Sequence, residues 1–149
     1  VAVARILAVS FLNSLLKRLM DIFISLWAIT FLLPFWLLLY ILIKLDSPGP
    51  GLYIHKRVGR NGKDFTCFKF RTMRIDADPH KLAESKEDDR ITVLGHFLRK
   101  TSLDETLQLL NVLLGQMSIV GPRPALKVQV ENFTEEDKWK LKVKPGLTG

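Results

Sequence analysis

Residues 22–43 read IFISLWAITFLLPFWLLLYILI, and this stretch decides the architecture because it holds no charged side chain between Asp21 and Lys44. The hydrocarbon core of a bilayer requires about 20 apolar residues in helical form, so the stretch is long enough to cross it. It is too long and too uniformly apolar for one face of a helix in a water-soluble core. It is also too long for the apolar part of a signal peptide, and no small-residue cleavage site follows it. The sequence therefore predicts a membrane segment.

Pro34 lies near the middle of this segment. Proline removes a backbone donor and clashes with the preceding turn, so a kink is expected there. One interpretation is a kinked helix that spans the membrane, since such prolines are tolerated in membranes. The other is a re-entrant hairpin whose two ends lie on one face of the membrane. Lys17 and Arg18 before the segment and Lys44 after it fit two cytoplasmic ends, because cytoplasmic flanks are enriched in basic residues. The residues alone leave both topologies open.

Composition and charge narrow the function classes. The chain has 149 residues, 48% of them hydrophobic, which excludes a disordered protein and fits one domain with a membrane element. A formal net charge of +7 indicates an anionic partner, which is a lipid surface, a phosphorylated substrate or nucleic acid. No nucleic-acid-binding motif accompanies the basic residues, so we expect no nucleic acid partner. Cys67 is the only cysteine, which excludes an intrachain disulfide and favours a reducing, cytoplasmic setting.

The pattern divides the chain into three parts. Residues 1–16 form an apolar lead-in, which is either an amphipathic helix on the membrane surface or a linker. Residues 17–45 are the membrane element, and residues 46–149 form a domain in the cytosol. Residues 47–51 read SPGPG and predict a rigid turn at the junction. Because the sequence stops in mid-pattern at Gly149, we expect this domain to be truncated at its C-terminus.

A β-hairpin is predicted directly after the turn. Residues 52–58 and 63–71 are short runs rich in β-branched and aromatic side chains, and Asn61-Gly62 between them is a strong hairpin signal. Many cations lie along these runs. They form either a basic face beside anionic lipid headgroups or a wall that binds phosphate. The charged residues 76–90 that follow predict an exposed helix or loop.

Residues 102–105 read SLDE and predict the start of a helix. Ser102 and Glu105 have the spacing of a capping box, leucines recur at helical spacing up to Leu114, and Gly115 fits the end of the helix. Asp104 and Glu105 then lie in the first turn, where acidic residues are favoured by the helix dipole for structural reasons alone. The same position keeps a carboxylate ionised, and an ionised aspartate is a competent nucleophile at phosphorus and a ligand for magnesium.

Arg123 lies between two prolines in the sequence GPRP (121–124). The prolines restrict its backbone, and a guanidinium held in this way can bind a phosphate through two hydrogen bonds. The alternative is a rigid loop with a solvent-facing arginine. Apolar side chains recur at helical spacing over residues 91–100, which predicts a helix there. A charged surface helix is predicted over residues 131–144. The expected fold class is α+β, with a membrane helix-break-helix followed by a small, mostly helical cytosolic domain that contains the β-hairpin.

Six motifs in this order resemble the bacterial sugar transferase family, the monotopic polyprenol-phosphate phosphoglycosyl transferases. The resemblance covers residues 17–149. The motifs are KRLMDI (17–22), KLDSPGP (44–50), FKFRTM (68–73), TSLDE (101–105), QLLNVLLGQMSIVGPRP (108–124) and PGLTG (145–149). One departure is Thr106, where the family usually has leucine; because threonine is small, we expect little effect.

The resemblance implies an enzyme that transfers a phosphosugar from a UDP-sugar to a polyprenol phosphate, releases UMP and uses Mg²⁺. It implies a location on the cytoplasmic face of the bacterial inner membrane, where surface-glycan assembly starts, and a re-entrant membrane element broken at Pro34. Asp104 is implied to be the covalent nucleophile and a magnesium ligand, assisted by Glu105. The implied substrate-binding residues are Lys69, Arg71, Arg99 and Arg123.

Two further expectations concern partners. The candidate partners are the UDP-sugar donor, the polyprenol phosphate acceptor and membrane lipid, and a homodimer is a candidate assembly. The competing hypothesis is a membrane-anchored scaffold without catalytic activity, which binds anionic lipid or partner proteins through the basic hairpin.

Overall fold

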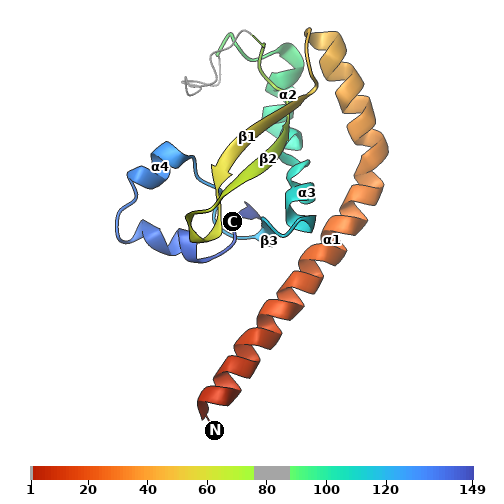
Figure 1. Ribbon diagram of the computed structural model, residues 1–149. Helices are drawn as coiled ribbons and strands as arrows, with labels where there is room; N and C mark the ends of the chain where they lie inside the picture. The colour runs from red at the N-terminus through yellow and green to blue at the C-terminus, as the bar shows by residue number, and fades with distance from the viewer. Residues whose placement is uncertain (1, 76–87) are drawn as a thin grey trace.

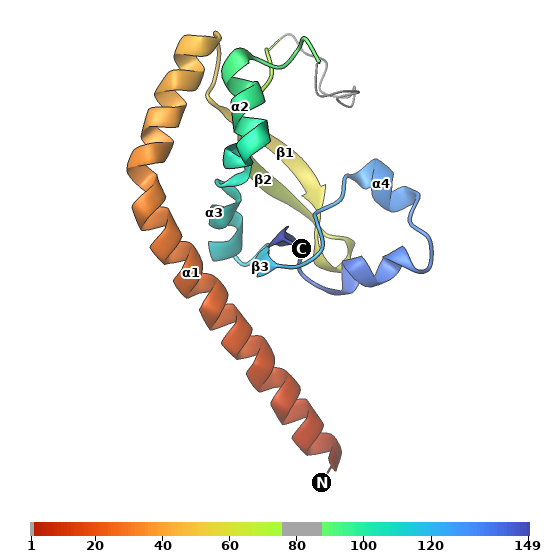
Figure 2. The ribbon, with the colours of Figure 1, turned by 180° about the vertical axis from the view of Figure 1, so that it is seen from behind.

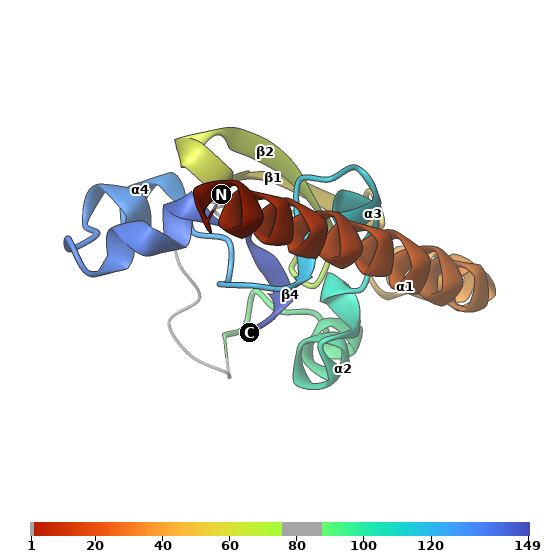
Figure 3. The ribbon, with the colours of Figure 1, turned by 90° about the horizontal axis from the view of Figure 1, so that it is seen from below.

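The computed structural model describes residues 2–75 and 88–149, with side chains described from residue 12 onward. The predicted exposed segment 76–90 therefore lies, apart from its last three residues, outside the described part of the chain. A single long helix, α1 (Ala2–Asp46), runs along one side of a head domain formed by the residues after it (Figures 1 and 2). In the view from below, the N-terminal end of α1 lies nearest the viewer (Figure 3).

Pro34 lies inside α1, which remains helical on both sides of it. The expected break is therefore corrected to a bend, which is visible in the second half of the helix (Figure 1). One proline removes only one backbone donor, and the surrounding helix can absorb this loss. Packing against the head domain from Trp36 onward stabilises the helix beyond the proline.

The hydrophobic core lies between the second half of α1 and the head domain. Before this region α1 exposes large apolar side chains, including Phe23, Trp27 and Phe31. After Pro34 one face of the helix is buried instead. The buried core side chains, which come from α1 and from three segments of the head domain, are Trp36, Leu39, Ile43, Phe70, Leu98, Leu107 and Leu109.

The predicted hairpin is confirmed. Strand β1 (Leu52–Val58) pairs antiparallel with β2 (Asp64–Phe70), and His55 lies opposite Cys67 in the register. A short 3-10 turn, η1 (Arg60–Gly62), joins the strands. Asn61 and Gly62 have φ angles of 59° and 71°, which is the left-handed region that this residue pair tolerates. The Asn-Gly turn predicted from the sequence therefore forms in the structure.

The segment that carries the two acids differs from the prediction. Helix α2 (Val93–Thr101) ends at Ser102, whose φ of 57° is left-handed, and its side chain caps no helix. The acids lie in a 3-10 turn, η2 (Leu103–Glu105), and α3 (Gln108–Leu113) begins only after it. The capping box is therefore wrong, because Ser102 terminates the preceding helix instead of starting the next one. Gly115, with a φ of 80°, follows α3 as expected.

The last third of the chain is mostly irregular. Strands β3 (Ser118–Val120) and β4 (Gly146–Thr148) pair in parallel. Between them lie α4 (Lys127–Glu131) and a third 3-10 segment, η3 (Asp137–Lys142), which replace the single surface helix expected over 131–144. The parallel pair brings the GPRP loop, which follows β3, against the C-terminal strand.

Polar side chains join α1 to the head domain on both sides of the apolar segment. Before it, the carboxylate of Asp21 accepts hydrogen bonds from Ser118 Oγ at 2.9 Å and from the Ile119 backbone N–H at 3.0 Å. After it, the guanidinium of Arg71 donates to the backbone carbonyl and hydroxyl of Ser47, at 2.6 and 2.8 Å. One domain therefore holds both ends of the segment.

Candidate active site

Four of the predicted site residues form one charged cluster. Lys69 Nζ lies 2.8 Å from Asp104 Oδ2 and 3.2 Å from Glu105 Oε1, and Arg123 Nη2 lies 2.6 Å from the same Glu105 oxygen. The two acids therefore sit between a lysine from β2 and an arginine from the loop after β3. These groups come together only in the folded chain, since Lys69 and Asp104 lie in different elements.

Asp104 is the most deeply buried member of the cluster. Its side chain is 3% exposed, whereas that of Arg123 is 77% exposed. Asp104 Oδ2 accepts no directed hydrogen bond from any described residue, although the Lys69 ammonium lies within ion-pair distance of it. A buried carboxylate oxygen without a directed hydrogen bond is costly in an inert position. It is available to attack a substrate or bind a cation.

Glu105 is held as a carboxylate by its neighbours. Burial acts to raise its pKa, but the charges of Lys69 and Arg123 and their hydrogen bonds outweigh burial, so the pKa of Glu105 lies below its ordinary value. The side chain is about one-fifth exposed. The positive environment that the sequence assigned to a helix dipole is supplied instead by these two cations.

Arg99 and Arg71 lie elsewhere. Arg99, in the last turn of α2, donates from Nε to Thr72 Oγ1 at 2.9 Å. Arg71 is buried, and its terminal nitrogens donate to the backbone carbonyls of Pro48 and Ser47 at 2.7 and 2.6 Å. The structure therefore gives Arg71 a structural position at the junction after α1, apart from the acids, and shows no contact between Arg99 and the acids.

A small polar pocket opens beside the cluster. The hairpin, the turn η2, the start of α3, the GPRP loop and β4 line it. The lining residues are His55, Arg57, Cys67, Lys69, Glu105, Gln108, Arg123, Pro124, Gly146 and Leu147. From the sequence alone, neither His55 nor Gln108 was identified as a site residue, and Arg57 was considered only as one of the hairpin cations that form either a basic face or a phosphate-binding wall. Strand alternation is the signal that could have found His55, since it shares a face of β1 with Arg57.

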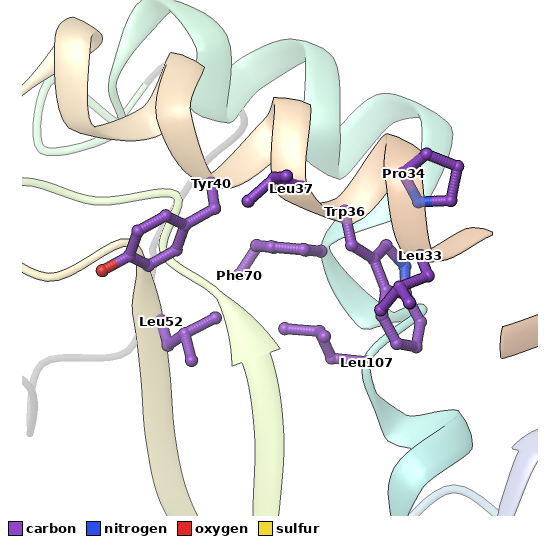
Figure 4. Close-up of a pocket in the computed structure, with 8 residues that line it drawn as sticks. All are labelled: Leu33, Pro34, Trp36, Leu37, Tyr40, Leu52, Phe70 and Leu107. Atoms are coloured by element: carbon purple, nitrogen blue, oxygen red, sulfur yellow. The ribbon is translucent and has the colours of Figure 1, made fainter. Parts of the chain in front are cut away.

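An apolar groove of about 470 Å³ lies on the other face of the hairpin, where the paired residues Leu52 and Phe70 line it. Figure 4 shows its wall, which is formed by α1 around Pro34, by both hairpin strands and by Leu107. Leu107 lines the groove, and its neighbour Gln108 lines the polar pocket. The lining contains no charged side chain among the described residues. The groove therefore suits a hydrocarbon chain, whereas the polar pocket suits a charged or hydrogen-bonding group.

The acids fit a magnesium ion only in part. Magnesium is commonly held by one or two carboxylates together with substrate phosphates and water. Asp104, with its unbonded Oδ2, and the adjacent Glu105 can supply this set. The described residues contain no group of three or more His, Cys, Asp or Glu side chains that could hold a metal by themselves. The arrangement therefore suits an ion that arrives with a phosphate substrate.

The part of α1 from Leu12 to Asp46 is long and apolar enough to cross a membrane, judged by length and composition. Only a small share of its most apolar stretch is buried inside the protein, which distinguishes it from a core helix. The exposed apolar surface requires an apolar environment. The chain is therefore associated with a membrane through α1.

Comparison with known sequences finds sugar transferases among the proteins similar to this chain. Residues 12–149 match the family described as "Bacterial sugar transferase". The chain is 42% identical over 150 residues to the undecaprenyl-phosphate galactose phosphotransferase of Salmonella typhimurium, covering 90% of this chain and 31% of that protein. It is 40% identical over 141 residues to the UDP-glucose:undecaprenyl-phosphate glucose-1-phosphate transferase of Escherichia coli, covering 92% and 30%. It is 46% identical over 146 residues to the exopolysaccharide production protein PSS of Rhizobium leguminosarum bv. phaseoli, covering 93% and 73%.

The extent of these matches differs between relatives. The chain spans about a third of the length of the Salmonella and Escherichia proteins and nearly three quarters of the Rhizobium protein. The matched region includes α1 from residue 12 onward, the hairpin and the charged cluster.

Proposed function

The chain belongs to the bacterial sugar transferase family, and from this premise we propose that it transfers a phosphosugar from a UDP-sugar to a polyprenol phosphate. Two of the relatives, from Salmonella and Escherichia, are named as transferases of galactose phosphate or glucose 1-phosphate that use undecaprenyl phosphate. The observation that carries the proposal is the buried Asp104 carboxylate, whose Oδ2 accepts no hydrogen bond from the described residues and faces Lys69. The product would start the assembly of a surface glycan.

The first step uses Asp104 as the nucleophile. One carboxylate oxygen attacks the β-phosphorus of the UDP-sugar, and the bond from this phosphorus to the bridging oxygen breaks. UMP leaves with that oxygen, and the sugar phosphate remains bound to Asp104. Lys69 and Arg123 stabilise the negative charge that spreads over the phosphate oxygens in the transition state.

The second step regenerates the carboxylate. An oxygen of the polyprenol phosphate attacks the phosphorus held by Asp104, the bond to the carboxylate breaks, and a polyprenyl diphosphate sugar is released. Glu105 keeps Lys69 and Arg123 in position through both steps, because it contacts both cations. Magnesium, held by Asp104 with Glu105 and substrate phosphate, would supply further neutralisation of charge.

The apolar groove supports a lipid acceptor. Leu107 in its wall and Gln108 in the polar pocket are neighbours in the chain and follow closely after Asp104, so a prenyl chain in the groove would lie against the segment that carries the acids. The donor is water-soluble and reaches the polar pocket from the other side. We infer that substrates of opposite solubility meet at the turn that carries the acids.

The contacts of α1 support a re-entrant topology. A straight helix over residues 22–43 would span about 33 Å, enough to cross the hydrocarbon core of about 30 Å. Yet the head domain contacts Asp21 before the segment and Ser47 after it. A domain on one side of the membrane cannot hold both ends of a helix that crosses it. We therefore propose that α1 enters and leaves on the cytoplasmic face of the inner membrane, with its bend near Pro34.

Intact-protein mass tests the covalent step. The protein is held in lipid nanodiscs and mixed with Mg²⁺ and a panel of UDP-sugars, without a lipid acceptor. The expected result is a mass increase of one phosphosugar that is lost in Asp104→Asn. Asp137→Asn is the matched control, because Asp137 pairs with Lys140 on the surface, away from the cluster.

An adduct that persists in Asp104→Asn would contradict the assignment of the nucleophile. A wild-type protein that forms no adduct, binds no UDP-sugar and still binds vesicles of anionic lipid would favour the scaffold hypothesis instead. Thermal unfolding of Asp104→Asn in the same nanodiscs shows whether the loss of the adduct reflects chemistry or misfolding.

A further inference from the structure

One face of the hairpin forms a wall of the polar pocket. Successive side chains of a strand point to opposite faces, so Tyr53, His55 and Arg57 share one face of β1. Cys67 lies opposite His55 in the register, and Lys69 lies opposite Tyr53. His55 therefore stands on the same face as the lysine that pairs with Asp104, and both residues line the pocket.

The imidazole nitrogens of His55 lack hydrogen-bond partners within the described part of the protein. Both ring nitrogens are buried, and neither makes a hydrogen bond to any described residue. Tyr53 stacks on the ring, with centroids 5.2 Å apart and planes inclined by 20°, which restricts the ring's orientation. Buried polar groups without partners are rare because they cost free energy. A pair of them on the wall of a substrate pocket indicates groups that bind a ligand.

The charge of His55 limits which ligand it suits. Burial lowers its pKa to about 4, helped by the nearby charges of Arg57 and Lys69, while Glu105 acts in the opposite direction. The ring is therefore neutral near pH 7 and carries one N–H donor and one nitrogen acceptor. The cations of the pocket, Arg57, Lys69 and Arg123, bind phosphate oxygens more strongly than a neutral ring does. A hydroxyl group, which both donates and accepts, matches a neutral imidazole.

We propose that His55 binds a hydroxyl group of the sugar that is transferred. The proposal rests on the proposed function and assigns part of its donor specificity to the hairpin. The sugar is attached to the phosphate that Asp104 attacks, so it lies beside Lys69 and Glu105, with which His55 shares the pocket. The nucleoside is joined to the other phosphate and lies further from this centre. His55 is thus a specificity-determining residue.

The two unpaired nitrogens make the pocket selective. A site that hydrogen-bonds a hydroxyl rejects an analogue without it, because its own polar groups are then buried without partners. His55 already has two such nitrogens when the pocket holds no donor. A sugar that presents no hydroxyl to them gains nothing from this wall.

Calorimetric binding to the protein in nanodiscs tests the proposal. The variants are His55→Leu, which removes both polar atoms, and His55→Gln, which keeps a donor and an acceptor. Ile54→Leu is the matched control, because Ile54 is exposed on the opposite face of β1. The probes are UMP, UDP-galactose, UDP-glucose and UDP-N-acetylgalactosamine, with Mg²⁺ present.

We expect His55→Leu to weaken binding of the preferred UDP-sugar about tenfold, the size of one lost hydrogen bond, and to leave UMP binding unchanged. His55→Gln should recover most of the loss. The melting temperature of ligand-free His55→Leu should equal or exceed that of wild type, because the variant removes two unsatisfied buried atoms.

Three results would overturn the assignment. Equal weakening of UMP and UDP-sugar would place His55 away from the sugar. Unchanged binding in His55→Leu would remove it from the site, and a lower melting temperature without rescue by His55→Gln would make its role structural. If wild type binds none of the probes, the proposed function itself fails, which is a separate outcome from any of these.

Discussion

Trp36 Nε1 donates a hydrogen bond to Thr106 Oγ1 at 3.0 Å, and this bond connects α1 to the turn that carries Asp104 and Glu105. Thr106 Oγ1 in turn donates to the backbone carbonyl of Leu103 at 2.7 Å, so the hydroxyl spans the turn η2. No pattern in the sequence indicated a role for Thr106. The bond makes the shape of the turn η2 depend on the position of α1 at Trp36, two residues after Pro34.

Removing either partner of this bond tests the connection. We expect Trp36→Phe and Thr106→Val each to lower the free energy of unfolding by about 1 kcal/mol, with the double variant losing less than the sum. We also expect adduct formation to slow several-fold in each, because Asp104 is less well oriented. Denaturation and adduct kinetics in nanodiscs measure both effects. Strictly additive losses would show that the two side chains act independently.

Lys69 and Arg71 lie two residues apart, but substitutions at these positions should have different effects. The first should lower activity and the second should lower stability. Lys69→Met leaves Asp104 buried without its cation, so adduct formation should fall by about 100-fold or more. Arg71→Met removes hydrogen bonds to Ser47 and Pro48 and should lower the melting temperature while binding of UDP-sugar persists. Donor binding lost in Arg71→Met with unchanged stability would return this arginine to the site.

Gly146 allows the GPRP loop to approach β4. A Cβ atom at this position would lie 2.1 Å from the Gly121 backbone nitrogen, so Gly146→Ala must displace the loop. We expect a destabilisation of about 1–3 kcal/mol and weaker donor binding, since Arg123 moves with the loop.

Gly62→Ala is the control for this prediction. A methyl group at Gly62 would meet no atom within 4 Å, so the cost is limited to the left-handed backbone at a φ of 71°. Gly62→Ala should lower stability by about 1 kcal/mol and leave donor binding intact. If both variants lost donor binding equally, the contact between the GPRP loop and β4 would not be the cause of the loss.

His55 should make stability depend on pH. Its pKa is about 4 in the folded chain and about 6.5 when unfolded, so the unfolded chain binds more protons between these values. Stability is then complete above pH 6.5 and is lost as the pH falls toward 4. Because His55 is only partly buried, we expect about 1 kcal/mol between pH 7 and pH 5.

Thermal unfolding of His55→Gln at the same two pH values provides the comparison. The variant should lose less stability than wild type on acidification. Glu105, whose pKa is lowered by Lys69 and Arg123, is present in both proteins, so its contribution to the pH dependence is the same in wild type and variant. Identical pH dependence in wild type and variant would show that the imidazole is already solvated in the folded protein.

Accessibility of the two ends of α1 tests the topology. Single cysteines at the exposed positions Met20 and Leu45, in a Cys67→Ser background, are labelled with a membrane-impermeant maleimide. Both should react in inverted vesicles and neither in right-side-out vesicles. Labelling of the two positions from opposite faces would establish a spanning helix. Pro34→Ala should shift the protein toward that state, because it restores the missing donor.

Local patterns were sufficient for several features. Asn61-Gly62 predicted the hairpin correctly because its left-handed turn depends on those two residues alone. The apolar run 22–43 predicted a membrane-associated helix from its length. The pattern at 102–105 misled because Ser102 is shared by two neighbouring helices, and the end of α2 determines its conformation. A capping signal is reliable only where no helix ends at the same residue.

The sequence by itself determined which groups are present: an uncharged membrane segment, two adjacent acids and cations in recognisable motifs. Tertiary structure decided which of them meet. Lys69 contacts Asp104 because it lies within β2, whereas Arg71 follows the end of that strand and turns to Ser47 instead. The periodic spacing of apolar side chains predicts a single helix or strand. Contacts between elements depend on strand register and on packing, which the spacing does not contain. For the same reason His55, distant in sequence from Asp104, lines the pocket beside the acids.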